Sequence, residues 1–337
     1  MPILTARRFV LVLAGLTLAL ALAILLCASV GSSGYTLLDL LRPDPGPAAD
    51  MIVRVRLPRV LIAVLAGAAL AAAGAVFQGI LRNPLADPYI LGISGGAALG
   101  FITASTAGLG AAATALPLRG AAAFGGSIAT VGLLVLLSRA HGRVGTDPMI
   151  LNGVVLNTVY LSLILLVQTM IGESRMHGVM LWMVGSVPVE GYGVIGGLAA
   201  ILAAGILGLT VLGRDLNLIA AGEDVARGLG VEVERTRLVA ILFASLITAA
   251  VVSVAGLIGF AGLIVPHAAR LLFGPDHRLL VPAAAILGGI FLLLADTAAR
   301  VVLAPTELPV GVLTAICGGP FFIWLYRVRR RKVAFHG

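Results

Sequence analysis

Charged and aromatic residues are scarce in this chain of 337 residues: 11% are Asp, Glu, Lys or Arg, and 5% are Phe, Trp or Tyr. A soluble domain usually carries about 25% charged residues, so the composition excludes an ordinary soluble protein. What the chain has instead is 60% hydrophobic residues and a mean hydropathy of +1.10. Apolar stretches fill most of residues 9–326, and the charged residues fall mainly between them. The sequence therefore predicts a polytopic membrane protein.

The apolar runs are long and unbroken, which excludes the alternating pattern of a membrane β-barrel. Because lipid cannot satisfy backbone polar groups, each span must be a helix, and a helix needs roughly 20 residues to cross the hydrocarbon core. We predict an all-α polytopic fold that forms one transmembrane domain over residues 1–337. Its ten spans are expected at residues 9–31, 57–80, 90–110, 118–138, 149–171, 178–211, 238–255, 256–270, 279–301 and 309–326.

Ten spans place both termini on the same side of the membrane. Most of the 23 Lys and Arg residues fall on that side, which the positive-inside rule identifies as cytoplasmic. The basic tail, residues 327–337, fits a topology anchor beside anionic lipid. On the other side, residues 32–56 are rich in Gly, Pro and Asp and predict an external loop with a short surface helix near residues 35–41.

Lysine is almost absent, since Lys332 is the only one. A G-x-x-x-x-G-K-[ST] phosphate loop is therefore excluded, and the chain cannot hydrolyse ATP by that route unaided. The two cysteines, Cys27 and Cys317, fall in predicted spans and are interpreted as packing residues. The five histidines have no partner at a metal-ligand spacing. We expect no catalytic residues, no metal site and no bound cofactor, and an integral membrane enzyme is disfavoured.

Ionisable residues are nearly missing from the deep parts of the spans. A carrier coupled to ions or protons usually places such residues there. Asp296 and Arg300 form an i, i+4 pair, but near the outer end of their helix. Interhelical hydrogen bonds would account for the polar residues within the spans, which are Gln78, Asn152, Asn157 and Gln168.

The longest internal polar segment is Gly213 to Arg237. Its composition predicts two short amphipathic helices joined at Gly228 to Gly230, on the cytoplasmic side. Such a segment either connects two spans or docks a soluble partner, and both alternatives are open at this point.

Several motifs, in order along nearly the whole chain, resemble the FecCD family, the permease subunits of ABC importers for iron chelates, haem and cobalamin. The matching stretches are Arg56-Leu57-Pro58-Arg59, Asn83-Pro84-Leu85-Ala86-Asp87-Pro88, Leu91-Gly92-Ile93-Ser94-Gly95-Gly96-Ala97, Trp182-Met183-Val184-Gly185, Gly259 to His267, Leu294-Ala295-Asp296, Glu307 to Gly311 and Gly319 to Leu325.

The resemblance implies a type II importer permease: a homodimer with its path at the dimer interface, two copies of a cytoplasmic ABC ATPase that bind ATP and Mg, and a periplasmic substrate-binding protein. It implies the bacterial inner membrane as location. In the family, the segment matching Gly213 to Arg237 sits in a cleft of the ATPase. The coupling residues expected here are Gly222, Glu223, Ala226, Arg227, Leu229 and Gly230.

The resemblance also assigns expected roles outside the coupling segment. Arg56, Arg59 and Arg300 match arginines that dock acidic residues of the binding protein, although marking the membrane boundary is the alternative for them. Thr146 and Asp147 match the cytoplasmic gate, but a helix N-cap at Asp147 before Pro148 explains them equally well. The polar span residues Gln78, Asn152, Asn157 and Gln168 become candidates to line the path.

The expected function is ATP-driven import of a ferric siderophore, haem or cobalamin by alternating access, with no distinction among these chelates. The alternative is a carrier or channel that works without an ATPase. The Gly222 to Gly230 segment discriminates between them, because a carrier would not need it. Bulky replacements at Glu223 or Arg227 should uncouple an importer and leave a carrier active.

Overall fold

The computed structural model describes residues 5–31, 34–41, 46–107, 116–140, 143–144, 146–170, 173–304 and 306–321. These residues form a helical bundle, which confirms the all-α prediction; one two-residue ladder joins β1 (Arg139–Ala140) to β2 (Arg143–Val144). The α-helices are α1 (Ala6–Ser29), α2 (Gly46–Met51), α3 (Leu57–Ile80), α4 (Ile93–Thr106), α5 (Leu116–Leu137), α6 (Thr146–Gln168), α7 (Glu173–Val184), α8 (Tyr192–Val211), α9 (Gly213–Ala221), α10 (Glu223–Gly228), α11 (Val233–Ala255), α12 (Ala261–Phe273), α13 (His277–Val301) and a final helix, Val310–Phe321.

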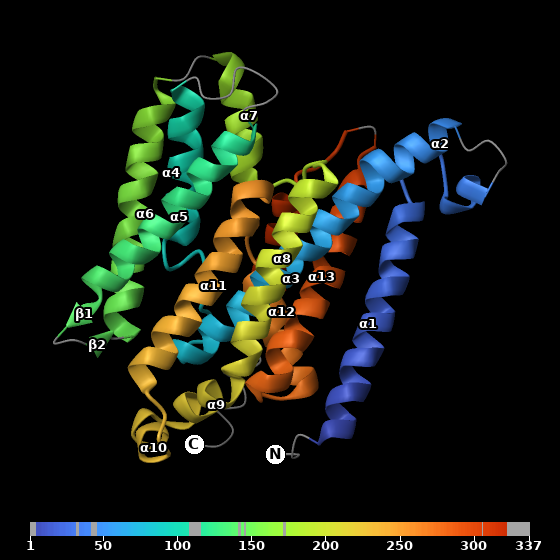
Figure 1. The fold of residues 1–337 in the computed structure, drawn as a ribbon. Coiled ribbons are helices and arrows are strands. Elements are labelled where there is room, and N and C mark those ends of the chain that lie inside the picture. Colours follow the sequence, from blue (N-terminus) through green and yellow to red (C-terminus); the bar gives the residue numbers. More distant parts are fainter. Residues whose placement is uncertain are drawn as a thin grey trace.

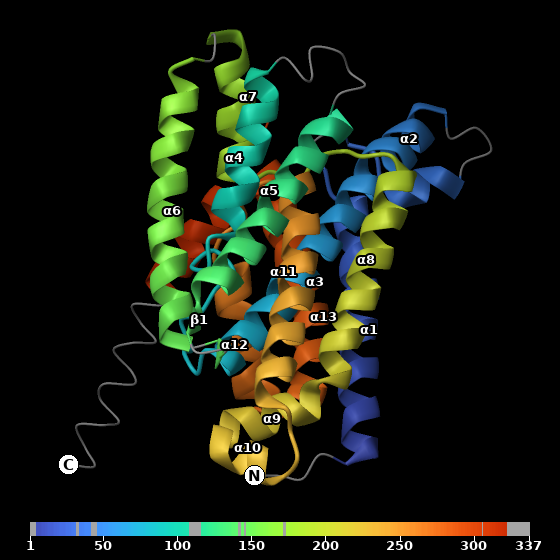
Figure 2. The same cartoon turned by 60° about the vertical axis from the view of Figure 1, so that its left-hand side comes forward.

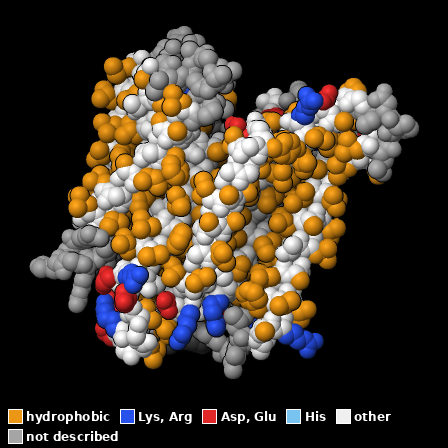
Figure 3. Space-filling view, viewed as in Figure 1, with side chains coloured by type: hydrophobic (Ala, Val, Ile, Leu, Met, Phe, Trp, Pro, Cys, Tyr) orange, Lys and Arg blue, Asp and Glu red, His pale blue; other side chains and the backbone are white. Residues whose placement is uncertain are grey.

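Seven of the described helices are long and apolar enough to cross a membrane, by length and composition. Three shorter apolar helices, α4, α12 and Val310–Phe321, accompany them. Each of the ten predicted spans overlaps one of these ten helices. In the space-filling view, hydrophobic side chains cover the middle of the molecule, and charged side chains gather at the end that carries α9 and α10 (Figure 3). The predicted basic tail, 327–337, lies outside the described residues.

Helix α3 runs through the centre of the bundle and is packed by α11, α12 and α13 (Figure 1). From Ala66 to Ile80 it is buried at nearly every position. Its contact with α13 is made at glycines: a Cβ atom added at Gly288 would overlap the carbonyl of Gly67 and the side chain of Ala71. Small residues allow backbones to approach this closely in lipid, where van der Waals packing holds helices together.

A second group, α4, α5, α6 and α7, forms one side of the molecule, and α1 lies at the opposite edge (Figures 1 and 2). Helix α6 packs on α4 and α5 and leaves a long apolar face exposed, which includes Leu151, Val155, Leu161 and Leu165. Helix α1 packs mainly on α13, and Arg8 Nη2 donates to the carbonyl of Phe273 at 2.9 Å.

Two boundaries differ from the prediction. The expected span 178–211 is two helices, α7 and α8, separated by an extended linker over residues 185–191 that contains Pro188. The expected external loop 32–56 ends earlier, because the helical segment Gly46–Ile80 is continuous. Its π-helical turn η2 (Ile52–Arg56) precedes Pro58, whose missing N–H would leave a gap in a regular α-helix. The expected surface helix near 35–41 is the 3₁₀ helix η1 (Leu37–Leu41).

Candidate functional site

The predicted coupling segment forms a compact hairpin of α9 and α10 at the end of the bundle where α1 begins (Figure 1). The two helices meet at Gly222, whose φ is 154°, and the chain leaves α10 through Gly230, whose φ is 83°. Both values lie where side chains with a Cβ are disfavoured. Underneath, Ile219, Ala226, Val231 and Val233 make a small core of their own. Two joined helices are thus confirmed for this segment, but the predicted junction is wrong: α9 and α10 meet at Gly222, and Gly228 to Gly230 instead end α10 and lead into α11.

Ion pairs hold this hairpin to the first turns of α11. Glu223 accepts hydrogen bonds from Arg237, which is 3% exposed, and from Arg227 Nη2 at 3.0 Å. Arg227 also reaches Glu234 at 3.3 Å. Burial by itself would raise the pKa of the Glu223 carboxyl, but Arg237 and Arg227 outweigh that effect, so the pKa lies below its usual range. Glu223 and Arg227 therefore maintain the shape of the hairpin.

The hairpin presents apolar side chains at its tip. Val225 is 53% exposed and Leu229 is 62% exposed, whereas Ala226 between them is fully buried. Of the six predicted coupling residues, Leu229 is exposed at the tip, Ala226 fills the core below it, and the two glycines form the turns. Val225 was not predicted; its position three residues after the junction at Gly222, on an otherwise charged helix, was the available signal.

The hairpin is also tied to the centre of the bundle. Arg82, just beyond α3, donates through Nη2 to the carbonyl of Ile219 at 2.8 Å. Asn217 donates to Asp276 at 2.7 Å and accepts from the backbone N–H of His277 at 2.8 Å. The Asp276 side chain also bonds Arg278, which lowers the pKa of Asp276 to about 2. These contacts join α9 to the end of α3 and the start of α13.

The three predicted docking arginines lie at the opposite end, and the protein itself contacts all three. Arg56 is 2% exposed, and its Nη1 donates to the carbonyls of Ala28 at 3.2 Å and Tyr35 at 2.6 Å. Its guanidinium thus joins the end of α1 to the start of α3. Arg300 is 7% exposed and pairs with Asp296 at 3.1 Å.

Asp296 is the centre of this charged cluster. Fully buried, it receives Arg300 on Oδ2 and both Nε and Nη2 of Arg59 on Oδ1, the latter at 3.1 and 3.0 Å. Arg59 uses its remaining nitrogen, Nη1, for Glu307 at 2.6 Å, and the Glu307 side chain is 52% exposed. Arg59 and Glu307 are thus where the cluster meets the surface. Asp296 and Arg300, spaced i, i+4 in the sequence, thus form an ion pair in the structure.

The polar residues expected to line a path are engaged inside the bundle. Gln78 donates to the carbonyl of Leu263 at 3.1 Å, and Asn157 to that of Tyr89 at 2.7 Å. Asn152 donates to Ser138 at 3.2 Å, and Gln168 contacts Met183 Sδ at 3.3 Å. The bonds of Gln78 and Gln168 are the interhelical bonds expected as the alternative, whereas Asn157 bonds the loop before α4 and Asn152 bonds a residue just after α5. The gate candidates Thr146 and Asp147 occupy the first turn of α6, and their side chains lie outside what the structure describes.

One buried carboxyl was missed. Asp87 lies in the loop between α3 and α4, outside the spans, and is 6% exposed. Burial raises the pKa of Asp87 to about 6, although the hydrogen bond from the backbone N–H of Tyr89 to Oδ1, at 2.8 Å, acts the other way. In the sequence it reads as an ordinary turn residue between two prolines. Asp87 is buried because α12 packs against it at Gly262. This contact depends on tertiary packing and is not visible in the sequence.

The order of these elements along the chain matches a known family, since the FecCD transport family aligns with residues 16–328. This chain belongs to that family. The match covers the coupling hairpin, the arginine cluster and the loop around Asp87 in one alignment. The prediction of a transport permease with the fold of this family is confirmed.

Curated relatives from distant organisms are also named as transport permeases. The chain is 39% identical over 285 residues to the cobalamin import system permease protein BtuC of Halobacterium salinarum, covering 85% of this chain and 75% of that protein. It is 40% identical over 284 residues to the hemin transport system permease protein HmuU of Yersinia pestis, covering 83% and 84%. A solved structure described as an inward-facing ABC transporter of the metal-chelate type superposes with a TM-score of 0.83 at 30% identity, covering 95% of this chain and 99% of that one.

Proposed function

We propose that this chain is the permease subunit of an ABC importer for a metal chelate: a ferric siderophore, haem or cobalamin. A partner ATPase would bind ATP and Mg and supply the energy, and a periplasmic binding protein would deliver the chelate. Family membership supports the transport role, and relatives named for cobalamin and hemin support the cargo class.

The observation that carries the proposal is the coupling hairpin. Its tip exposes Val225 and Leu229 on a charged end of the molecule, away from the apolar faces that meet lipid (Figure 3). Exposed apolar side chains surrounded by charge are typical of a protein contact. The salt links to α11 keep the tip rigid. We therefore assign Leu229 and Val225 as the ATPase contact, with Glu223 and Arg227 supporting the hairpin.

A second copy of the chain would complete the path. The exposed face of α6 carries Thr158 and Ser162 among large apolar residues, and both hydroxyls bond their own helix at 3.0 Å. A mixed apolar and hydroxyl surface suits a bulky, partly apolar chelate. We propose that this face lines the path at a homodimer interface, in place of Asn152 and Asn157, which are engaged within the chain.

For the binding protein, the part of the arginine cluster that reaches the surface is the Arg59–Glu307 pair. We propose that an acidic residue of the binding protein displaces Glu307 from Arg59, since an Arg fork pairs well with a second carboxylate. Arg56 and Arg300 then act by holding the surrounding helices. This end would face the periplasm, and the hairpin end, where α1 begins, would face the cytoplasm, in a bacterial inner membrane with both termini inside.

The test is reconstitution with a candidate ATPase and binding protein in proteoliposomes, loaded in turn with ferric siderophore, haem and cobalamin. Uptake of one ligand that requires ATP is expected. Leu229→Asp should abolish uptake and ligand-stimulated ATP hydrolysis, because it places a charge in an apolar contact. The matched control, Leu272→Asp, changes another Leu, 66% exposed at the end of α12, and should retain activity. Ligand flux that persists without the ATPase would contradict the proposal and favour a carrier.

A further inference from the structure

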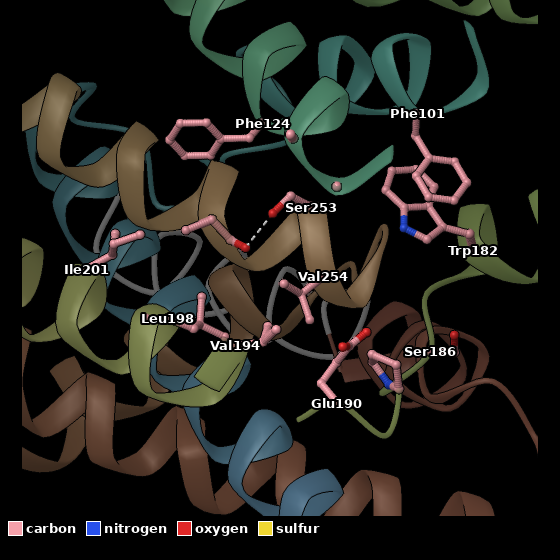
Figure 4. Close-up of a pocket in the computed structure, with 15 residues that line it drawn as sticks. Phe101, Phe124, Trp182, Ser186, Glu190, Val194, Leu198, Ile201, Ser253 and Val254 are labelled. Atoms are coloured by element: carbon pink, nitrogen blue, oxygen red, sulfur yellow. Dashed lines mark hydrogen bonds between the residues drawn. The ribbon is translucent and has the colours of Figure 1, made fainter. Parts of the chain in front are cut away.

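A pocket of about 440 Å³ lies between α4, α5, α7, α8, α11 and the linker 185–191, apart from both the coupling hairpin and the arginine cluster (Figure 4). Its volume falls in the range of about 300–1,000 Å³ that is usual for small-molecule sites. Most of its lining is apolar, including Phe101, Phe124 and Val254. None of the residues assigned to transport contributes to it.

The rim of the pocket belongs to surfaces that meet lipid. On α8, Val194, Gly197 and Ile201 are exposed, and on α5 so is Ala121. Both helices are long enough to span the membrane. Val194, Leu198 and Ile201 follow each other at i, i+4 and i+7 and therefore form one stripe, about 10 Å long at 1.5 Å per residue. An apolar chain entering from the bilayer can lie along this stripe.

The polar side chains that line the pocket are Glu190, Trp182 and two serines. The side chain of Glu190 points into it from the linker, two residues before α8 begins, and no charged group among the described residues offsets its carboxylate. Trp182 is 9% exposed and stacks on Phe101 with ring centroids 4.1 Å apart. Its indole nitrogen, on the pocket side of the ring, has no hydrogen-bond acceptor (Figure 4).

A buried N–H without an acceptor is costly, and a partly buried carboxylate favours a cation beside it. Two serines, Ser186 and Ser253, also line the pocket, and Ser253 already donates to the carbonyl of Ala250 at 2.8 Å (Figure 4). The pocket thus offers a negative group near the outer end of α8, a hydrogen-bond donor, and an apolar stripe that runs from the outer end of α8 toward the middle of the helix.

We propose that this pocket binds one phospholipid with a primary ammonium headgroup. The ammonium pairs with Glu190, an ester oxygen accepts from the Trp182 indole, and one acyl chain lies against Val194, Leu198 and Ile201. The negative charge of Glu190 disfavours anionic lipids. Choline lipids are disfavoured because their headgroup has no N–H to donate to the Glu190 carboxylate. Binding here is independent of which solute the protein carries.

The experiment uses Trp182 as its own probe. The chain has two tryptophans, so the full chain carrying Trp324→Phe reports only from Trp182. It is reconstituted in phosphatidylcholine vesicles with equal mole fractions of acyl-brominated phosphatidylethanolamine, phosphatidylcholine or phosphatidylglycerol. Quenching of Trp182 emission by the ethanolamine lipid should exceed that by the other two about two- to fivefold, the factor that a partly exposed ion pair provides.

Glu190→Gln should remove this preference and leave basal quenching in place. Glu232→Gln, a control whose side chain is 71% exposed at the hairpin end, should keep it. Gly197→Phe places a ring at the pocket rim, where an added Cβ meets nothing within 4 Å, and should reduce quenching by all three lipids. Equal quenching by the three lipids, or a preference that survives Glu190→Gln, would overturn the proposal, as would a preference for the anionic lipid.

Discussion

Replacing Asp296 with Asn tests whether the charged cluster on α3 and α13 is structural. The substitution keeps the shape of the side chain but removes the negative charge that Arg59 and Arg300 share, and Asp296 is fully buried. Removing one partner of a buried ion pair costs about 3–5 kcal/mol, because the other charge stays buried without compensation. We expect Asp296→Asn to lower the Tm of the detergent-purified chain on the order of 10 °C.

The matched control is Glu307→Gln, at the exposed edge of the same cluster. Its side chain is 52% exposed, so the pair with Arg59 contributes less than about 1 kcal/mol, and the Tm should fall only slightly. Replacing Arg59, Asp296 and Arg300 together by Leu should recover much of the loss. The reasoning is refuted if Asp296→Asn lowers the Tm no more than Glu307→Gln does. In that case the arginines would be free to serve a partner.

Three further outcomes are expected. Because burial raises the pKa of Asp87 to about 6, the stability of the wild-type protein should fall as pH rises from about 4 to about 6. Asp87→Asn should remove that fall and stabilise the protein by at most about 3 kcal/mol above pH 6. Equal changes in Tm at pH 4 and pH 7.5 would contradict this. Gly288→Ala should lower the Tm by several degrees, because its Cβ overlaps the facing α3 backbone, whereas Gly197→Ala, in open space, should not. Asp276→Ala removes the side-chain cap of α13 and the bond to Asn217; a loss of about 1–2 kcal/mol is expected, and a Tm equal to that of wild type would show that neither contact contributes.

Hydropathy was sufficient to place the spans, because burial in lipid and burial in protein both select apolar residues. It failed at residues 185–191, where a short linker between two apolar helices was read as part of one long span although Gly185, Pro188, Glu190 and Gly191 marked the break. At Pro58 the error was the reverse. The span was expected to begin at residue 57, but a π-turn before Pro58 accommodates the missing hydrogen bond and the helix continues back to Gly46.

The site was predictable where local sequence decides it. A polar segment between apolar spans predicted the two short helices, but their junction was expected at Gly228 to Gly230 and lies at Gly222. The link from Glu223 to Arg237 crosses 14 residues, and the burial of Arg56 depends on α1 and the residues around Tyr35. Such contacts depend on how separate helices pack, and the spacing of residues along the chain does not determine that packing. The arginines therefore looked like surface charges in the sequence.

The bonds that tie α9 to the bundle determine how a force on the hairpin travels. A push on Leu229 reaches α3 through Arg82 and Ile219, and α13 through Asn217 and Asp276. Those two helices are locked to each other at Gly67 and Gly288 in the middle and at Arg59 and Asp296 at the far end. Because α3 and α13 run from the hairpin to the charged cluster, a partner that displaces the hairpin slightly on one side of the membrane would tilt both helices. The charged cluster on the other side would then move with them.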